Sequence, residues 1–142
     1  MTRIDFYAGA TEKASVACRL AAKAIQQSNR VLIFAPDERL LKQVDQLLWT
    51  TPPTGFVPHC WVHDAVAADT PVLLAAQLDN TPHDEILINL GNELPAAFTR
   101  FARVLEIVTA DEDDRAQART RFRFYRDRGY ALETHQLSDS SR

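Results

Sequence analysis

Short apolar runs alternate with amphipathic segments along the chain. The run VLIFA at residues 31–35 is apolar at every position, which is typical of a strand whose two faces are both covered. Between residues 37 and 49, apolar side chains recur every three or four positions, and this period predicts a helix with one buried face. Strands that alternate with helices predict an α/β fold with a largely parallel sheet.

The rest of the chain continues this alternation. Further strands, including one at an edge of the sheet, are expected at residues 3–7, 85–90, 103–109 and 130–137. Further helices are expected at residues 11–28, 93–102 and 111–129. Thr11 is the expected N-cap of the first helix, and Gly129 stands where a C′ glycine ends the last one. Residues 71–78 form another apolar run, whereas residues 56–70 show no clean period.

Length and linker content indicate a single domain. The chain has 142 residues, within the usual size of one domain, and it shows neither an internal repeat nor a linker long enough to separate two domains. We therefore expect one three-layer α/β/α domain of Rossmann-like type over residues 1–137. Residues 138–142 are expected to form a disordered tail.

Composition and charge argue against several classes of protein. Hydrophobic residues make up 46% and charged residues 25% of the chain, which excludes a mostly disordered protein. The net charge of −3 disfavours a protein that coats nucleic acid. No apolar stretch reaches the length of about 18 residues that predicts a transmembrane helix, and the N-terminus lacks the pattern of a signal peptide. Two distant cysteines suit a reducing compartment, so we expect a cytoplasmic protein without a membrane contact.

No motif predicts a cofactor. The first strand-to-helix turn, FYAGATEK, contains a single glycine, and the second, FAPDER, places Pro36 where the backbone would have to cradle phosphate. The glycine-rich fingerprints of dinucleotide and phosphate loops are both absent from these turns. We therefore expect no bound nucleotide cofactor.

The most metal-like residues follow in the segment His59, Cys60, His63 and Asp64. His59 and His63 have the spacing of two ligands on one helix, and a cysteine beside a histidine is the pair that a thiol nucleophile needs. However, prolines precede the segment, no second ligand pair follows it, and adjacent side chains seldom point at each other. We expect hydrogen-bonded histidines in a partly buried loop, with no metal and no catalytic residues.

Residues 49–58, WTTPPTGFVP, combine aromatic residues and prolines at the end of a predicted helix. One interpretation is that the large aromatic side chains pack on the core. The other is a rigid apolar docking patch, because aromatic side chains and a proline-stiffened backbone lose little entropy on binding. The sequence leaves both interpretations open.

Arginines dominate the last predicted helix. At 100° per residue, the arginines of one stripe fall within about 80° of one another, namely Arg115, Arg119, Arg123 and Arg126. Phe122 lies beside this arginine stripe, whereas Ala118 and Tyr125 lie on the flank expected to face the core. The stripe fits a solvated basic face, a local nucleic-acid contact or, because it offers charge and a ring together, a short acidic peptide with an aromatic end.

These residues occur in an order that resembles the chi subunits of bacterial DNA polymerase III. The resemblance runs from about residue 3 to residue 134 and is weakest at residues 60–80. Its N-terminal and central motifs are D-F-Y at Asp5–Tyr7, R-V-L-I at Arg30–Ile33, L-W at Leu48–Trp49, F-V-P-H at Phe56–His59 and the segment Asp84–Leu90. The closing pattern R-x-x-F-x-x-Y-R-x-x-G runs from Arg119 to Gly129.

The resemblance implies a non-catalytic adaptor in the clamp-loader assembly of the replicative polymerase. Such an adaptor pairs with the psi subunit and holds the acidic, phenylalanine-ended C-terminal tail of single-stranded DNA-binding protein (SSB), so that it meets DNA only indirectly or weakly. The implied psi contacts are Trp49, Phe56, Val57 and Pro58. The implied contacts to the SSB tail are Val108, Arg115, Arg119 and Phe122, with Arg123 and Arg126 in support.

Two positions depart from part of the family, and one alternative function stays open. Some family members have lysine where Arg115 stands and tyrosine where Phe122 stands, so charge and ring are kept but the tyrosine hydroxyl is lost. The alternative is an α/β enzyme that acts on a small phosphorylated substrate and uses the arginine stripe as its anion site. Such an enzyme needs a general base or nucleophile that converges on the stripe.

Overall fold

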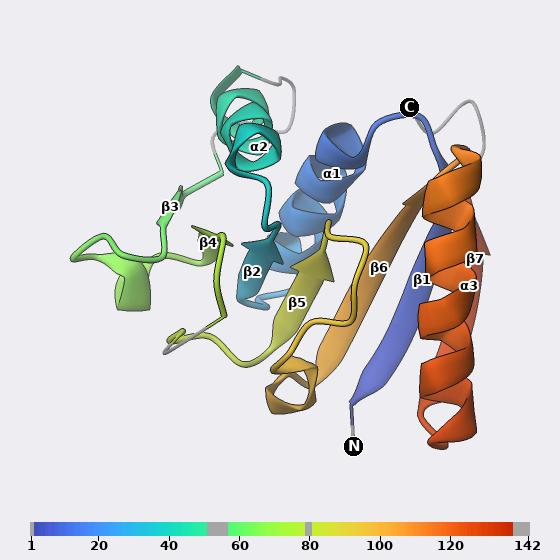
Figure 1. Ribbon diagram of the computed structural model, residues 1–142. Helices are drawn as coiled ribbons and strands as arrows, with labels where there is room; N and C mark the ends of the chain where they lie inside the picture. Colours follow the sequence, from blue (N-terminus) through green and yellow to red (C-terminus); the bar gives the residue numbers. More distant parts are fainter. Residues whose placement is uncertain (1, 51–56, 79–80, 138–142) are drawn as a thin grey trace.

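The computed structural model describes residues 2–50, 57–78 and 81–137, which form a seven-stranded parallel sheet with helices on both faces (Figure 1). The strands are β1 (Arg3–Ala10), β2 (Val31–Phe34), β3 (His59–Trp61), β4 (Val72–Ala75), β5 (Ile86–Asn89), β6 (Arg103–Thr109) and β7 (Ala131–Gln136). Their order across the sheet is β3-β4-β2-β5-β6-β1-β7, and each neighbouring pair is parallel. The predicted α/β fold with its edge strand at the C-terminal end is confirmed.

The helices divide between the two faces of the sheet. Helices α1 (Lys13–Gln26) and α2 (Glu38–Thr50) cover one face, and α3 (Glu112–Asp127) covers the other (Figure 1). Most buried residues of α1 are alanines, whose small side chains allow the helix to lie close to both the sheet and α2. Within the residues that the structure describes, no helix is long and apolar enough to cross a bilayer.

Two local expectations are wrong. The helix expected at residues 93–102 is only a single 3₁₀ turn, Phe98–Arg100. The Glu93 carbonyl, which a helix over these residues would use, instead accepts a hydrogen bond from Asn89 Nδ2. Thr11 does not cap α1, since Glu12 occupies the N-cap position and no side chain caps the helix there. Residues 56–70, which show no period, contain the three-residue edge strand β3 and the 3₁₀ turn Ala67–Asp69. The tail expected at residues 138–142 lies outside the described residues.

Helix α3 is anchored to the sheet by a buried polar network around Glu106 of β6. One carboxylate oxygen, Oε1, accepts hydrogen bonds from Asn89 Nδ2 at 2.9 Å and Arg121 Nε at 3.1 Å. The other, Oε2, accepts one from the Tyr125 hydroxyl at 2.8 Å, and Arg121 Nη1 donates to the Asn92 carbonyl at 2.8 Å. Burial raises the pKa of Glu106, while the charge of Arg121 and the three hydrogen bonds act against that rise. The network fixes which side of α3 faces the sheet.

The first turn of α3 has a second anchor in Asp114. Its Oδ2 accepts hydrogen bonds from the backbone N–H and the hydroxyl of Thr109 at 2.8 and 3.0 Å. Its Oδ1 accepts one from Lys13 Nζ at 3.1 Å, and the same ammonium donates to the Leu90 carbonyl. Burial by itself raises the pKa of Asp114, but the hydrogen bonds from Thr109 and Lys13 outweigh it and leave the pKa below its usual value. The anchor ties the start of α3 to the ends of β5 and β6 and to the start of α1.

We expect Arg121→Met to lower the free energy of unfolding by about 3–5 kcal/mol, because it leaves the buried Glu106 carboxylate without its cation. Adding Glu106→Gln to this variant removes the unpaired charge and should recover part of the loss. Urea denaturation measures both effects. The matched control is Arg126→Met on the exposed side of α3, which should change stability by no more than about 0.5 kcal/mol. A loss below about 1 kcal/mol for Arg121→Met would contradict the anchor.

We expect Asp114→Asn to lower the free energy of unfolding by about 1–3 kcal/mol at neutral pH, because hydrogen bonds to a charged acceptor are lost. The folded-state pKa of Asp114 is lowered, so its contribution is present above the unfolded-state pKa of about 3.9 and disappears as pH falls through the folded-state value. The stability difference between wild type and variant should therefore be constant from pH 5 to 7 and shrink below about pH 4. Asp113→Asn, in the same turn but exposed, serves as the control.

Candidate functional site

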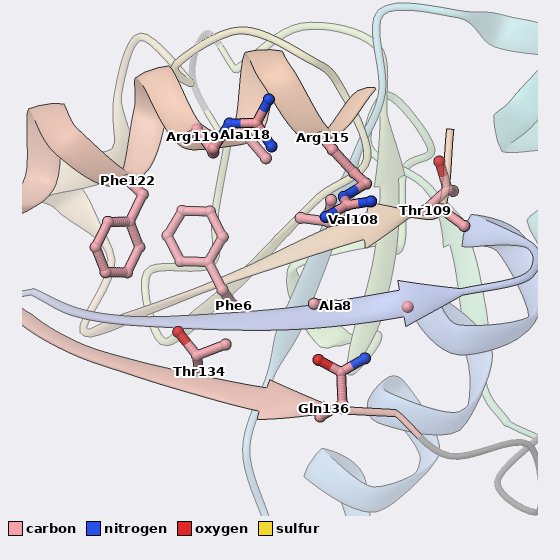
Figure 2. A pocket seen from close by; sticks show the side chains of 12 residues that line it. Phe6, Ala8, Val108, Thr109, Arg115, Ala118, Arg119, Phe122, Thr134 and Gln136 are labelled. Atoms are coloured by element: carbon pink, nitrogen blue, oxygen red, sulfur yellow. The ribbon is translucent and has the colours of Figure 1, made fainter. Parts of the chain in front are cut away.

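A pocket of about 450 Å³ opens between α3 and the carboxyl-terminal halves of β1, β6 and β7 (Figure 2). We call it the α3 pocket. On the helix side it is lined by Arg115, Ala118, Arg119 and Phe122. On the sheet side and in the adjoining loop it is lined by Phe6, Ala8, Gly9, Val108, Thr109, Ala110, Thr134 and Gln136.

The topology of the sheet places the pocket. The chain leaves β1 for α1 on one face, whereas it leaves the adjacent strand β6 for α3 on the other face. In parallel sheets, such a divergence opens a crevice at the carboxyl ends of the strands, where ligands commonly bind. The pocket lies beside this crevice, on the face that α3 covers.

Small residues hollow out the pocket. Ala118 faces inward from α3, and Ala8 lies opposite on β1 (Figure 2). Gly9, the next residue of β1, also lines the pocket. Gly9 has a positive φ of 87° at a shift in the register between β1 and β6. A Cβ at Gly9 would lie 2.7 Å from the amide nitrogen of Gln136, so a larger residue would strain the backbone and displace the Gln136 side chain from its place in the pocket wall.

One end of the pocket is apolar. The rings of Phe6 and Phe122 meet edge to face, with centroids 5.4 Å apart, which is a preferred geometry for aromatic pairs. Val108, near the end of β6 and closer to Arg115, is buried on the same face and extends the apolar wall from the two rings (Figure 2). This end can receive an apolar or aromatic group of a ligand.

Two guanidinium groups give the pocket a positive charge. Arg115 and Arg119 are exposed on α3, and among the residues that the structure describes neither forms an ion pair with a carboxylate. Arginine matches carboxylate and phosphate geometry with two parallel hydrogen bonds. The pocket therefore combines an anion-binding side with an apolar end.

The structure brings together four of the six residues expected at the SSB-tail site. Val108, Arg115, Arg119 and Phe122 all line the α3 pocket. The two supporting residues, Arg123 and Arg126, lie farther along α3 and do not line it, and Arg126 pairs with Asp127 at 3.1 Å. Phe6, Gly9, Thr134 and Gln136 were not among the expected residues. A glycine next to a predicted strand is a signal for a bulge or a close backbone approach, so Gly9 carries a sequence signal for its place in the pocket.

Three of the residues expected at the psi contact, Trp49, Val57 and Pro58, belong to α2 and to the segment before β3, at the other end of the sheet (Figure 1). Trp49 is 60% exposed at the end of α2, and Pro58 is exposed, whereas Val57 is buried in the core. Phe56 lies outside the described residues. Trp49 therefore does not pack in the core, whereas Val57 does and is not available at the surface, and the docking patch stays a prediction.

His59, the first residue of β3, connects this strand to α2. Its Nδ1 donates a hydrogen bond to the Val57 carbonyl at 2.6 Å, and its Nε2 lies 3.0 Å from Asp45 Oδ1 on α2. The ring meets Trp49 edge to face, with centroids 5.0 Å apart. Nearby, Asp64 accepts a hydrogen bond from the Trp61 backbone N–H. Both ring nitrogens of His59 face partners outside the metal-like segment. The side chains of this segment therefore do not converge on a shared centre.

A different group of potential ligands, Asp5, Glu133 and His135, has ligand atoms within 4.8 Å of one another. Arginines occupy the same carboxylates: Arg103 Nε lies 2.7 Å from Asp5 Oδ2, and Arg3 pairs with both Asp5 and Glu133. Burial by itself raises the pKa of Asp5, but hydrogen bonds from Arg103 and His135 outweigh it and lower the pKa. The group forms an ionic network that joins β1, β6 and β7.

The α3 pocket offers binding groups and no evident general base. Its lining contains no carboxylate, histidine, cysteine or lysine among the described residues, and its hydroxyl groups belong to Thr109 and Thr134. General acid–base catalysis needs a titratable side chain within hydrogen-bond reach of the substrate. The lining therefore offers groups that could bind an anionic ligand with an apolar group.

Comparison with known proteins identifies the family. The family model described as "DNA polymerase III chi subunit, HolC" matches residues 1–133. The DNA polymerase III subunit chi of Pseudomonas aeruginosa is 38% identical over 141 residues, which cover 96% of this chain and 98% of that protein. The subunits chi of Haemophilus influenzae and Escherichia coli are each 31% identical, covering 86% and 82% of this chain and 85% and 80% of those proteins. The chain thus belongs to the family of DNA polymerase III chi subunits, which function in DNA replication.

Proposed function

We propose that the protein is a non-catalytic, cytoplasmic adaptor of the DNA polymerase III holoenzyme. It links the clamp loader, through psi, to the acidic C-terminal tail of SSB. The observation that carries the proposal is the α3 pocket, in which two arginines without a carboxylate partner among the described residues stand next to an aromatic, apolar end. An acidic peptide that ends in phenylalanine has the complementary chemistry.

The two parts of the pocket would serve two parts of the tail. Arg115 and Arg119 would pair with the terminal carboxylate and the aspartates, a contact that salt weakens because exposed charges are screened over about 8–10 Å at 0.1–0.15 M. Phe122 and Val108, with Phe6 behind them, would hold the terminal ring, a contact that salt does not weaken. The volume of about 450 Å³ lies within the range of sites for small ligands.

A second surface would bind psi. Trp49 and Pro58 present exposed side chains at the end of α2 and before β3, and Phe56 and Val57 belong to the same short segment. A large exposed aromatic side chain beside a proline-containing loop is typical of an interface hot spot. Because α2 and β3 lie at the opposite end of the sheet from α3 and β7 (Figure 1), both partners can bind at the same time.

An enzyme that acts on a small phosphorylated substrate remains the alternative. The arginines of the α3 pocket suit a phosphate as well as a carboxylate, but the pocket lining supplies no general base. Co-purification separates the two functions, since an adaptor should bring down psi and SSB and an isolated enzyme should not.

We expect Arg119→Glu to abolish binding of the SSB tail, because it replaces attraction of the acidic peptide with repulsion. Phe122→Ala should weaken binding and leave the salt dependence in place, because it removes the ring contact and keeps both arginines. Calorimetric titration with the tail peptide at several salt concentrations measures both effects.

Two controls belong to this titration. Arg126→Glu changes charge in the same way on α3 but outside the pocket, so it should weaken binding much less than Arg119→Glu. A peptide that lacks the terminal phenylalanine tests the apolar end. If this peptide bound as well as the complete one, the stripe would be a nonspecific basic face, and unchanged binding by Arg119→Glu would place the site elsewhere.

We expect Trp49→Ala to weaken psi binding by about 2 kcal/mol or more if Trp49 is a central anchor. The substitution should leave tail binding unchanged, because α2 and the α3 pocket lie on different elements. Titration of the purified variant with psi measures the loss, and thermal unfolding checks that the fold is intact. Wild-type affinity for psi in the variant would assign the contact to another surface.

A further inference from the structure

Strand β7 presents an open edge of the sheet. It has six residues, Ala131–Gln136, and in the part of the chain that the structure describes it pairs only with β1, in an unbroken register from Arg3–Ala131 to Ala8–Gln136. The strand contains no proline. The opposite edge strand, β3, has only three residues. Proteins usually shorten, bend or block such edges because unpaired backbone groups invite another strand, and β7 is neither short nor interrupted.

The backbone groups on this edge belong to residues that also line the α3 pocket. The Leu137 N–H donates to the Ala8 carbonyl at 2.9 Å, so the backbone groups of Leu137 face β1. Successive residues of a strand direct these groups to alternate sides, and the N–H and C=O of Thr134 and Gln136 therefore point away from β1. The side chains of the same two residues line the pocket (Figure 2). A chain paired with this edge would lie directly beside the pocket.

We propose that the acidic peptide recognised by the α3 pocket binds as an eighth strand, parallel to β7, with its last residue in the pocket. This inference rests on the proposed function. It adds that main-chain hydrogen bonds to Thr134 and Gln136 hold the peptide along β7. The pairing resembles other cases in which an extended peptide adds to a sheet edge and side-chain pockets supply specificity.

The charges on α3 determine the direction. Its first turn is acidic, with Glu112, Asp113 and Asp114, and this turn follows the carboxyl end of β6, next to Arg115. The remaining arginines of the stripe follow along the helix toward Gly129, where the chain turns back into β7. A peptide whose terminal carboxylate meets Arg115 and whose upstream aspartates lie beside Arg119 and Arg123 keeps those aspartates away from the acidic turn. This places the peptide parallel to β7.

Residue-resolved amide hydrogen exchange tests the pairing directly. In the free protein, the Thr134 and Gln136 amides point away from β1, and the His135 amide faces β1. Saturation with the tail peptide should slow exchange at Thr134 and Gln136 at least tenfold and leave His135 within about twofold. Unchanged exchange at Thr134 and Gln136, while the resonances of Phe122 and Val108 report full binding, would overturn the inference.

Peptide variants give a second test that leaves the protein intact. In a parallel pair, alternate residues of the peptide direct their N–H groups toward β7. N-methylation of each residue in turn should therefore weaken binding about threefold to tenfold at every second position and less than twofold between them. Equal effects at all positions would overturn the added strand and leave the proposed function standing. If the unmodified peptide did not bind, both would fail.

A second copy of the chain is the other occupant that an open edge can take. Sedimentation of the peptide-free protein at concentrations up to those of the exchange experiment distinguishes it. A monomer is expected, with the Thr134 and Gln136 amides exchanging rapidly. A dimer that protects these amides without peptide would overturn the inference.

Discussion

The buried carboxylate of Glu106 determines how α3 lies on the sheet. A carboxylate in the core is tolerated only with partners for its oxygens, and two of its three hydrogen-bond donors, Arg121 and Tyr125, come from successive turns of α3. Because these two residues must point inward, Ala118 points inward as well, and Arg115, Arg119 and Phe122 reach the side of the helix next to β1 and β7. The lining of the α3 pocket thus depends on the ion pair between Glu106 and Arg121, neither of which lines the pocket.

The sequence predicted those features that depend on period. Consecutive apolar residues located β2, and helical spacing placed Ala118 and Tyr125 on the inner side of α3. The features that the sequence did not predict have a common cause, because they depend on packing between residues far apart in the chain. Phe98 and Phe101 enter the core through a 3₁₀ turn rather than a helix. Arg121 is the same residue type as the arginines of the stripe, and its burial depends on a partner in β6 that helical phase alone does not reveal.

The sequence predicted only part of the α3 pocket, for the same reason. Its arginines and Phe122 lie on one helix, so spacing and the family resemblance were sufficient to group them. Gly9, Thr134 and Gln136 join them only because β1 lies between β6 and β7, an arrangement that no local pattern encodes. The sequence also did not separate Val57, which packs in the core, from Trp49, which is exposed.

The position of β1 also has a consequence for the order in which the chain folds during synthesis. Arg3 pairs with Arg103 on one side and with Ala131 on the other. Strand β1 therefore cannot complete its pairing until β6 and β7 have been synthesised. Contacts of such long sequence separation slow folding. The end of the sheet that bears Trp49 is built from α1, β2, α2, β3 and β4, which all precede β5 in the chain, so it can form earlier. A nascent chain can therefore complete α2 and its neighbouring strands first, and the α3 pocket, whose walls include residues of β1, β6 and β7, can form only after β7 has emerged.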